Sequence, residues 1–333
     1  MKLSVVVPVY NKAPFLQECF DSILSQSFGD LELIVVDDRS TDNGLEVLRG
    51  IKDERMKLVP LERNLGPGGA AQYAMDLAQG EYIIRVDADD ICLPDRFAKQ
   101  VAFMDRNPGL GASGGHMRTF GDESGVWRFP VGQDACKAEI LFGNPVAQGT
   151  AIMRTRILRD RKIRFEVEWP RIGEDWMLWA RLLLHCEFDN LDEPLIMYRR
   201  GDQNSSVGLD RVSYRKVILR DVFRVWDIPL SEEQCDLHLM SLRSFVDPPS
   251  SETILAFRNW MEDLCAMNRA RSLFPQEAFE LRLRQAWDQL FYSVARSGVG
   301  PALAHYRLGP ERDPKRLIYL AKYTISRWLG RVS

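Results

Sequence analysis

Acidic side chains that could bind a metal ion or move a proton stand close together at three points of the chain. They are the pair Asp37-Asp38, the segment Asp87-Ala88-Asp89-Asp90 and the pair Glu174-Asp175. Carboxylates grouped this tightly repel one another unless a cation lies among them. Their hard oxygen atoms suit Mg²⁺ or Mn²⁺, which proteins often share with the phosphate groups of a substrate. The Asp87 to Asp90 segment therefore predicts a divalent-cation site.

Asp175 is also a candidate for proton transfer. Two tryptophans, Trp176 and Trp179, follow it in a helical pattern, so its carboxyl group can lie in a partly apolar cleft. Burial there would raise the pKa of Asp175 toward the value that suits a general base. The alternative is that Asp175 only caps the helix that follows it. The Asp-x-Asp segment has a similar alternative, as an ordinary turn at the end of a strand.

Strand and helix patterns alternate in the first half of the chain and decide where these groups lie. The predicted strands cover 3–9, 31–36, 56–61 and 82–86, and the predicted helices cover 13–26, 40–48 and 66–77. Continuous apolar strands separated by helices indicate an α/β fold with a mostly parallel sheet flanked by helices. Ligands of such sheets bind beyond the carboxyl ends of the strands. We therefore expect Tyr10-Asn11, Asp37-Asp38 and the Asp87 to Asp90 segment to face one crevice.

The second half of the chain has a different pattern. The stretch 110–164 is richer in glycine and turn residues, a helix is expected over 176–185, and a strand is expected over 194–198. Beyond residue 207 the pattern is mostly helical. The helices expected there cover 214–226, 231–245, 252–268 and 276–295. We expect two regions, a chemistry-bearing domain at 1–206 and a helical region at 207–333.

Composition excludes several classes of protein. The 333 residues carry a net charge of -3, which gives no electrostatic case for nucleic acid as a partner. The six cysteines are far apart and form no C-x-x-C pair, so we expect reduced thiols. No apolar stretch approaches the roughly 18 residues of a membrane span, and no signal peptide is evident at the N-terminus. The expected location is the cytoplasm, and the alternative is attachment to the cytoplasmic surface of the membrane.

Four ordered motifs together resemble those of family 2 glycosyltransferases. They are Val5-Val6-Val7-Pro8-Val9-Tyr10-Asn11, Val36-Asp37-Asp38-Arg39-Ser40-Thr41-Asp42, Asn64-Leu65-Gly66 and Asp87-Ala88-Asp89-Asp90. Gly173-Glu174-Asp175-Trp176 adds the acidic pair that this family carries before a helix. The resemblance covers about residues 1–206. It implies the Rossmann-like GT-A fold and an inverting, metal-dependent hexosyltransferase that uses a nucleotide-diphosphate sugar.

The resemblance also implies roles for individual residues. Asp38 would recognise the base, and the remaining residues of the nucleotide pocket would be Pro8, Tyr10, Asn11, Asn64 and Gly66. Asp87 would lie by the ribose and the metal, and Asp89 would be the main ligand of Mn²⁺ or Mg²⁺. Asp175 would be the general base that accepts the proton of the acceptor hydroxyl. A single displacement would then invert the anomeric centre.

The sequence departs from the family pattern at two places. Ala70-Ala71-Gln72 stands where many relatives have Ala-Arg-Asn, so one polar contact to the donor is missing. Gly201 stands where relatives often have a His that could bind the metal, and Asp202 follows it. Either Asp202 replaces that His, or water and the diphosphate complete the coordination of the metal.

The partners expected from the resemblance are a UDP-sugar as donor and a glycan or lipid-linked glycan as acceptor, in bacterial surface polysaccharide synthesis. Residues that could contact the acceptor are Asn144, Gln148 and Thr150, with Trp127 and Trp169 as sugar platforms or, more simply, packing residues. Two alternatives remain open. A sugar nucleotidyltransferase would carry a glycine-rich basic loop after the first strand, where this chain has Tyr10-Asn11-Lys12. A non-catalytic nucleotide-sugar-binding subunit is the other alternative.

The C-terminal segment 311–333 has the pattern of a basic amphipathic helix. Apolar residues from Leu317 to Leu329 recur at helical spacing, with Lys and Arg among them. The last 35 residues contain seven Lys or Arg and two acidic residues. Such a helix can lie in the interface of an anionic membrane. It can equally pack on the body of the protein or on another subunit.

Overall fold

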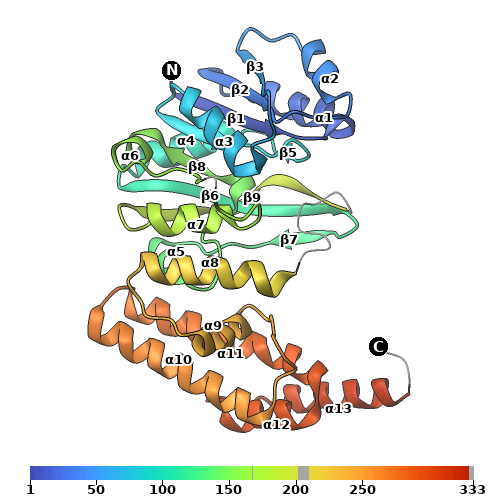
Figure 1. Cartoon of the computed structure of the whole chain (residues 1–333), viewed down its shortest axis with the longest axis vertical. Helices are drawn as coiled ribbons and strands as arrows, with labels where there is room; N and C mark the ends of the chain where they lie inside the picture. The colour runs from blue at the N-terminus through green and yellow to red at the C-terminus, as the bar shows by residue number, and fades with distance from the viewer. Residues whose placement is uncertain (167, 202–209, 330–333) are drawn as a thin grey trace. The chain divides into compact units, whose positions relative to one another are not determined.

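The chain folds into two compact units (Figure 1). The computed structural model describes residues 1–166, 168–201 and 210–329. Unit 1 comprises Met1–Ile140 and Asn144–Leu209, and unit 2 comprises Leu141–Gly143 and Asp210–Ser333. The predicted alternate ligand, Asp202, lies outside the described residues.

Unit 1 is built on one mixed sheet, which contains nine strands within the described part of the chain. The strands are β1 (Leu3–Val9), β2 (Leu31–Asp37), β3 (Met56–Pro60), β4 (Tyr82–Arg85), β5 (Ile91–Cys92), β6 (Leu110–Gly121), β7 (Gly125–Trp127), β8 (Ile152–Arg154) and β9 (Glu187–Arg200). Their order is β3-β2-β1-β4-β8-β6-β9-β5, with β7 paired to β6. The strands β3, β2, β1 and β4 are parallel, and β8 joins them antiparallel.

Helices cover both faces of the parallel strands. The helices of unit 1 are α1 (Ala13–Leu24), α2 (Gly44–Gly50), α3 (Gly66–Leu77), α4 (Arg96–Arg106), α5 (Gln133–Glu139), α6 (Thr155–Asp160) and α7 (Glu174–Leu182), with a 3₁₀ turn η1 (Gln148–Thr150). Of these, α5 contacts β9 and α6 contacts β8. Alternate residues of β1 such as Val5 and Val7 pack with Phe20 of α1 and Phe97 of α4 in one core. The helix α3 contacts β1 and β2 as well. Because both faces are covered, these strands are apolar throughout, as the sequence predicts.

The long strand β6 was not predicted from the sequence, which indicated a turn-rich stretch there. It pairs with β9 in parallel and with β7 and β8 in antiparallel orientation. Its glycines are needed for close packing, because a Cβ atom on Gly114 would lie 2.6 Å from Oγ1 of Thr150. A Cβ atom on Gly115 would lie 2.8 Å from the carbonyl oxygen of Glu193. Glycine therefore lets the sheet pack here instead of ending a strand.

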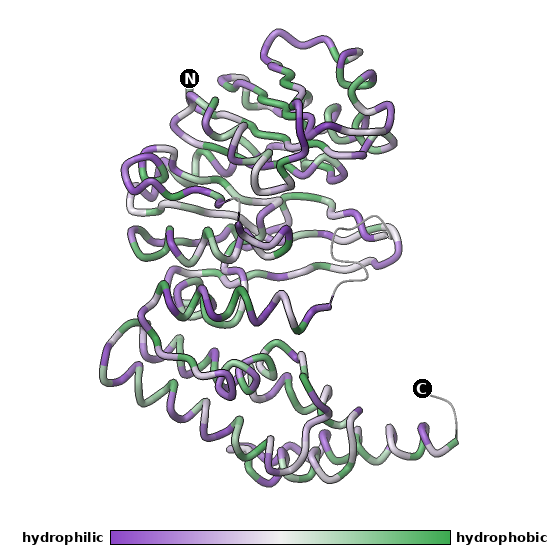
Figure 2. Tube along the Cα trace, in the orientation of Figure 1, coloured by the Kyte–Doolittle hydropathy of each residue, from purple (hydrophilic) through white to green (hydrophobic). Residues whose placement is uncertain are grey.

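Unit 2 is helical. Its helices are α8 (Arg211–Val225), α9 (Glu232–Ser241), α10 (Ser251–Arg271), α11 (Gln276–Ser297), α12 (Val299–Leu308) and α13 (Pro314–Trp328). The side chains of Asp210, Ser231 and Ser250 cap the first, second and third of these helices. Hydrophobic and hydrophilic residues alternate along the helices of this unit (Figure 2).

The core of unit 2 is aromatic and includes a buried histidine. His238 lies 5.1 Å from Phe142 and 4.9 Å from Phe223, measured between ring centroids. Its Nε2 bonds to the carbonyl oxygen of Leu141, and Nε1 of Trp260 donates to its Nδ1. Burial lowers the pKa of His238 to about 4, so the ring is neutral and structural. Among the described residues, no helix has both the length and the apolar character needed to cross a membrane.

Candidate active site

The loops after β1 and β2 are held together by Asn11. Oδ1 of Asn11 accepts a hydrogen bond of 2.7 Å from the backbone N–H of Thr41, and the Asn11 N–H donates to Oγ of Ser40. Asn11 adopts a φ of 52°, a left-handed conformation that asparagine tolerates better than most residues. Its neighbour Tyr10 remains 45% exposed, and Pro8 lies half-buried in β1. The structure thus places these three predicted pocket residues at one edge of the sheet.

Asp38 fastens the loop that leads into α3. Its two carboxylate oxygens accept hydrogen bonds from the N–H groups of Leu65, at 2.6 Å, and Gly66, at 2.9 Å. Nδ2 of Asn64 donates to the carbonyl oxygen of Asp38. Burial raises the pKa of Asp38, although these backbone bonds and the charge of Arg171 oppose the shift. Hydrogen bonds therefore connect Asp38 to Asn64 and Gly66. The sequence did not predict these bonds.

The Asp87 to Asp90 segment follows β4 directly. Oδ2 of Asp89 lies 2.5 Å from Nζ of Lys12, so an ammonium group is the cation beside this carboxylate. Oδ1 of Asp90 accepts a hydrogen bond from the N–H of Arg199, whose Nε donates to the carbonyl oxygen of Asp89. Asp90 is buried, and burial followed by the charges of Asp87 and Asp89 raises its pKa strongly. The strand β9 thus holds the backbone of the segment, while Asp87 and Asp89 keep partly exposed side chains.

The acidic pair Glu174-Asp175 lies in the first turn of α7. Nδ2 of Asn144 donates a hydrogen bond of 2.8 Å to Oδ2 of Asp175, and the N–H of Trp176 donates to Oδ1. Gly173 occupies the N-cap position of α7, so the alternative prediction that Asp175 caps this helix is wrong. Burial raises the pKa of both Asp175 and Glu174 above the usual range of a carboxyl group.

Arg85 connects these acidic groups, a role that sequence reasoning missed. Its side chain is 5% exposed at the end of β4, with Nε 3.2 Å from Oδ1 of Asp87 and Nη1 3.7 Å from Oε1 of Glu174. Its charge lowers the pKa of both Glu174 and Asp175, against the effect of burial. The signal for Arg85 was present in the sequence, as the single charge inside an apolar strand. The guanidinium therefore brings two of the three predicted acidic groups together.

The carboxylates suit a divalent cation only in part. Within the described residues, no three His, Cys, Asp or Glu side chains stand together as a complete metal site. Asp87 and Asp89 offer oxygen atoms alone, which is the donor set that Mg²⁺ and Mn²⁺ prefer. The backbone of η1 also comes close, because a Cβ atom on Gly149 would lie 3.5 Å from Oδ2 of Asp87. The residues present fit a cation that shares its coordination with a substrate diphosphate and water.

The three polar residues that the sequence analysis placed near the acceptor differ in their surroundings. Thr150 is fully buried and its hydroxyl bonds to the backbone of Gly115 and Ala147, so the prediction of a substrate contact is wrong for this residue. Both polar atoms of the Gln148 amide are buried without a hydrogen-bond partner in the described part of the chain. Asn144 contacts Asp175.

The two candidate sugar platforms, Trp127 and Trp169, pack against neighbouring side chains and remain partly exposed. Trp127 lies 5.4 Å from the ring of Tyr198, measured between centroids. The Arg181 guanidinium lies 4.5 Å from the Trp169 ring centroid, and Trp169 also meets Phe165 edge to face. Packing was the simpler expectation for both tryptophans.

Comparison with known proteins assigns the family. The matching family model is described as glycosyl transferase family 2 and covers residues 4–161. An uncharacterized glycosyltransferase of Haemophilus influenzae is 32% identical over 220 residues, which are 62% of this chain and 68% of that protein. The amylovoran biosynthesis glycosyltransferase AmsE of Erwinia amylovora is 30% identical over 207 residues, which are 60% of this chain and 76% of that protein.

Solved structures share the fold along nearly the whole chain. The S. aureus TarS 1–349 complex with UDP-GlcNAc aligns with a TM-score of 0.57 at 22% identity, over 99% of this chain and 93% of that one. The mannosyltransferase PcManGT of Pyrobaculum calidifontis, in complex with GDP-Man and Mn²⁺, aligns with a TM-score of 0.55 at 17% identity, over 99% and 83%. The GT-A fold that the resemblance implied is confirmed. The chain belongs to glycosyl transferase family 2, and it is a glycosyltransferase.

Proposed function

We propose that this glycosyltransferase inverts the anomeric centre as it moves a sugar from a nucleotide-diphosphate sugar, foremost a UDP-sugar, to a hydroxyl group of a glycan or lipid-linked glycan. The observation that carries the proposal is Arg85, which joins the Asp-x-Asp segment to the Glu174-Asp175 pair within hydrogen-bonding or ion-pair distance. The UDP-GlcNAc bound to the TarS neighbour supports the donor class. The name of AmsE supports a role in bacterial surface polysaccharide synthesis.

The nucleotide would bind at the edge where β1 and β2 end. A carboxylate has about four acceptor positions, and the loop amides use two of those of Asp38. Because Asp38 is 2% exposed, the base would have to bind at the small open part of this carboxylate. The exposed ring of Tyr10 can contact the nucleotide, while Pro8 and Asn11 shape the backbone beneath it. Asn64 and Gly66 complete this pocket through their bonds to Asp38.

The diphosphate would lie by Asp87 and Asp89. Mn²⁺ or Mg²⁺, when bound there, would neutralise the charge that develops on the leaving diphosphate. Lys12 has to give up its contact with Oδ2 of Asp89 before that oxygen can serve as a metal ligand. Its ammonium group then lies close enough to the same place to attract a phosphate oxygen.

Asp175 would accept the proton of the attacking hydroxyl. Asn144 and the N–H of Trp176 fix the orientation of its carboxylate, which leaves the group preorganised for proton transfer. Arg85 keeps the carboxylate ionised by opposing the effect of burial. A single displacement from the face opposite the leaving group then inverts the anomeric centre, so a second nucleophilic carboxylate is not needed.

The function is tested by transfer and hydrolysis assays over a panel of nucleotide sugars with Mn²⁺ or Mg²⁺. We expect sugar transfer to a hydroxyl-bearing acceptor with release of a nucleoside diphosphate. Release of inorganic pyrophosphate from a sugar phosphate and a nucleoside triphosphate would instead identify a sugar nucleotidyltransferase. Donor binding without turnover on any acceptor would favour a non-catalytic subunit.

Replacing Arg85 by glutamine should move the acidic limb of the pH–rate profile upward by about one pH unit or more. The Arg85 charge lowers the pKa of Asp175, so Asp175 stays protonated to higher pH when that charge is removed. The measurement is kcat/KM against pH for both proteins. An equal loss of rate at every pH would mean that Arg85 has only a structural role, and Arg106→Gln at the exposed end of α4 is the control.

The tail helix α13 supports a membrane contact as part of the same proposal. Its buried side carries Leu320 and Arg316. Arg316 pairs with Asp288 of α11 at 2.5 Å, so α13 packs on the other helices of unit 2. Its other side exposes Ile325 at 58% and Trp328 at 85%. Exposed apolar residues beside Lys and Arg suit the interface of an anionic membrane, where a lipid-linked acceptor would lie.

Replacing Ile325 and Trp328 together by serine should lower binding to phosphatidylglycerol vesicles by about tenfold or more, because each side chain loses its apolar transfer energy. Sedimentation with vesicles measures the bound fraction. Val217→Ser on α8, where the valine is also exposed, is the control. Unchanged binding of the double variant would contradict a membrane role, as would unchanged binding after deletion of residues 311–333.

A further inference from the structure

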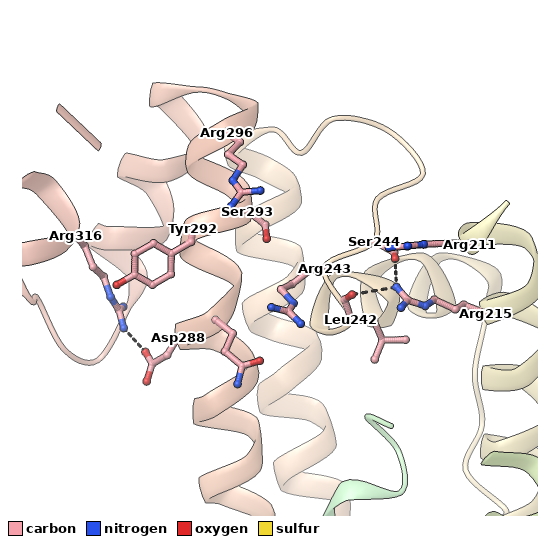
Figure 3. A pocket seen from close by; sticks show the side chains of 11 residues that line it. Arg211, Arg215, Leu242, Arg243, Ser244, Asp288, Tyr292, Ser293, Arg296 and Arg316 are labelled. Atoms are coloured by element: carbon pink, nitrogen blue, oxygen red, sulfur yellow. Dashed lines mark hydrogen bonds and ion pairs between the residues drawn. The ribbon is translucent and has the colours of Figure 1, made fainter. Parts of the chain in front are cut away.

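Unit 2 contains a cavity of about 620 Å³ that has five arginines among its eleven lining residues (Figure 3). Its charged lining residues are Arg211, Arg215, Arg243, Arg296, Arg316 and Asp288. They come from α8, from the segment after α9, from α11 and from α13. The volume lies within the roughly 300–1,000 Å³ of small-molecule sites, but such sites are mostly apolar. The charge of this cavity therefore points to a charged ligand.

Only one of the five guanidinium groups has a carboxylate partner in the lining. Arg316 pairs with Asp288 at 2.5 Å. Nη1 of Arg215 donates to the carbonyl oxygen of Leu242 at 3.1 Å and to Oγ of Ser244, which are both neutral acceptors (Figure 3). For the described part of the chain, no ion pair with a carboxylate is found for the other three arginines. The lining thus carries four positive charges that no acidic group balances.

This arrangement is unfavourable for the protein by itself. Burial lowers the pKa of Arg215, and the charges of Arg211 and Arg243 act in the same direction. The φ of 55° at Arg243 is the ordinary left-handed turn at the end of α9, where the N–H of Ser244 bonds to the carbonyl oxygen of Leu239. This turn fixes the backbone of Arg243 at the edge of the cavity. An anion in the cavity would relieve the repulsion.

We propose that this cavity binds a diphosphate or phosphate-ester group. Guanidinium groups recognise phosphate oxygens through paired, charge-assisted hydrogen bonds, and several of them around one cavity match a multiply charged anion. The neutral anchors of Arg215 hold its planar group in place before the ligand arrives. The site lies wholly in unit 2 and does not depend on the transfer reaction proposed above. The ligand is either a free anion such as pyrophosphate or the diphosphate group of a prenyl-linked molecule.

Calorimetric titration of the full chain with inorganic pyrophosphate tests this proposal. EDTA is present throughout, so that metal-dependent binding at Asp87 and Asp89 does not contribute. We expect one binding event per chain. The double variant Arg211→Gln, Arg243→Gln should weaken it by about tenfold or more, because two charge-assisted contacts are lost. Both side chains are exposed, so the variant should fold, which circular dichroism checks.

A matched control separates a specific site from a general effect of charge. Arg284→Gln on α11 removes the same charge from an exposed position outside the cavity and should leave pyrophosphate affinity unchanged. Equal weakening in this control, or no binding to the unaltered chain at millimolar pyrophosphate, would overturn the proposal. Farnesyl diphosphate then identifies the source of the ligand. Equal affinity for both probes supports a free anion, and tighter binding of the prenyl compound supports a lipid-linked one.

Discussion

Replacing Asp175 by asparagine should lower kcat for sugar transfer by about 10²–10⁴-fold, the usual contribution of a general base. An amide in this position cannot accept the proton of the acceptor hydroxyl. Asparagine keeps the size of the side chain and an oxygen that can accept the N–H of Trp176. The fold and the donor affinity should therefore change little. The rate is measured at saturating donor and acceptor, and donor affinity is measured by titration.

The pH dependence of the same enzyme provides a second readout. In the proposed mechanism Asp175 acts in its ionised form, and burial raises its pKa above the usual range of an aspartate. The rate should therefore be constant above this pKa and fall about tenfold per pH unit below it. In the Asp175→Asn protein this acidic limb should be absent. Asp160→Asn at the exposed end of α6 should keep both the rate and the limb, and unchanged transfer by Asp175→Asn would refute the assigned role.

Replacing Asp89 by alanine should weaken metal-dependent donor binding by more than about 100-fold, since losing even an outer partner of a metal ligand can cost that much. Asp89 has one of the two partly exposed carboxylates after β4, and Asp87 alone offers too few oxygen atoms to hold a hydrated cation tightly. Titration of a nucleotide sugar in the presence of Mn²⁺ measures the loss. Removal of the cation with EDTA should reproduce it in the unaltered protein.

The surface variant Asp30→Asn should bind the donor normally in the same titration. If Asp89→Ala keeps both donor affinity and transfer, the cation does not bind at the Asp-x-Asp segment. If EDTA has no effect on the unaltered protein while Asp89→Ala is inactive, Asp89 acts through Lys12 rather than through a cation. The two results are distinguishable because only the second depends on the 2.5 Å ion pair between these side chains.

The parallel half of the fold could be predicted because its strands are apolar on both faces. Val5 and Val7 pack in the core with α1 and α4, and α3 lies against the same strand. The strand β6 could not be predicted, since its glycines resemble a loop until the close contacts of Gly114 and Gly115 are known. Local sequence patterns do not reveal which backbone segments must approach one another in the fold.

The same limit applies to the candidate site. The acidic residues themselves were evident, because strand ends and adjacent carboxylates are local features. Their partners are distant in sequence, with 77 positions between Lys12 and Asp89 and 31 between Asn144 and Asp175. Such pairings depend on the strand order, which places β1 beside β4.

The pairing of Lys12 with Asp89 has a consequence for how a nucleotide and a cation would bind together. In the free protein, an internal ammonium group competes with any divalent ion for the same oxygen. Breaking that ion pair costs free energy, and an arriving diphosphate can return part of it by accepting the ammonium. In the proposed site, nucleotide and cation would then each favour the binding of the other, since coupling between two ligands is reciprocal. Under the metal role proposed for Asp89, the ion pair with Lys12 would keep this carboxylate occupied until the diphosphate of a donor accepts the ammonium group.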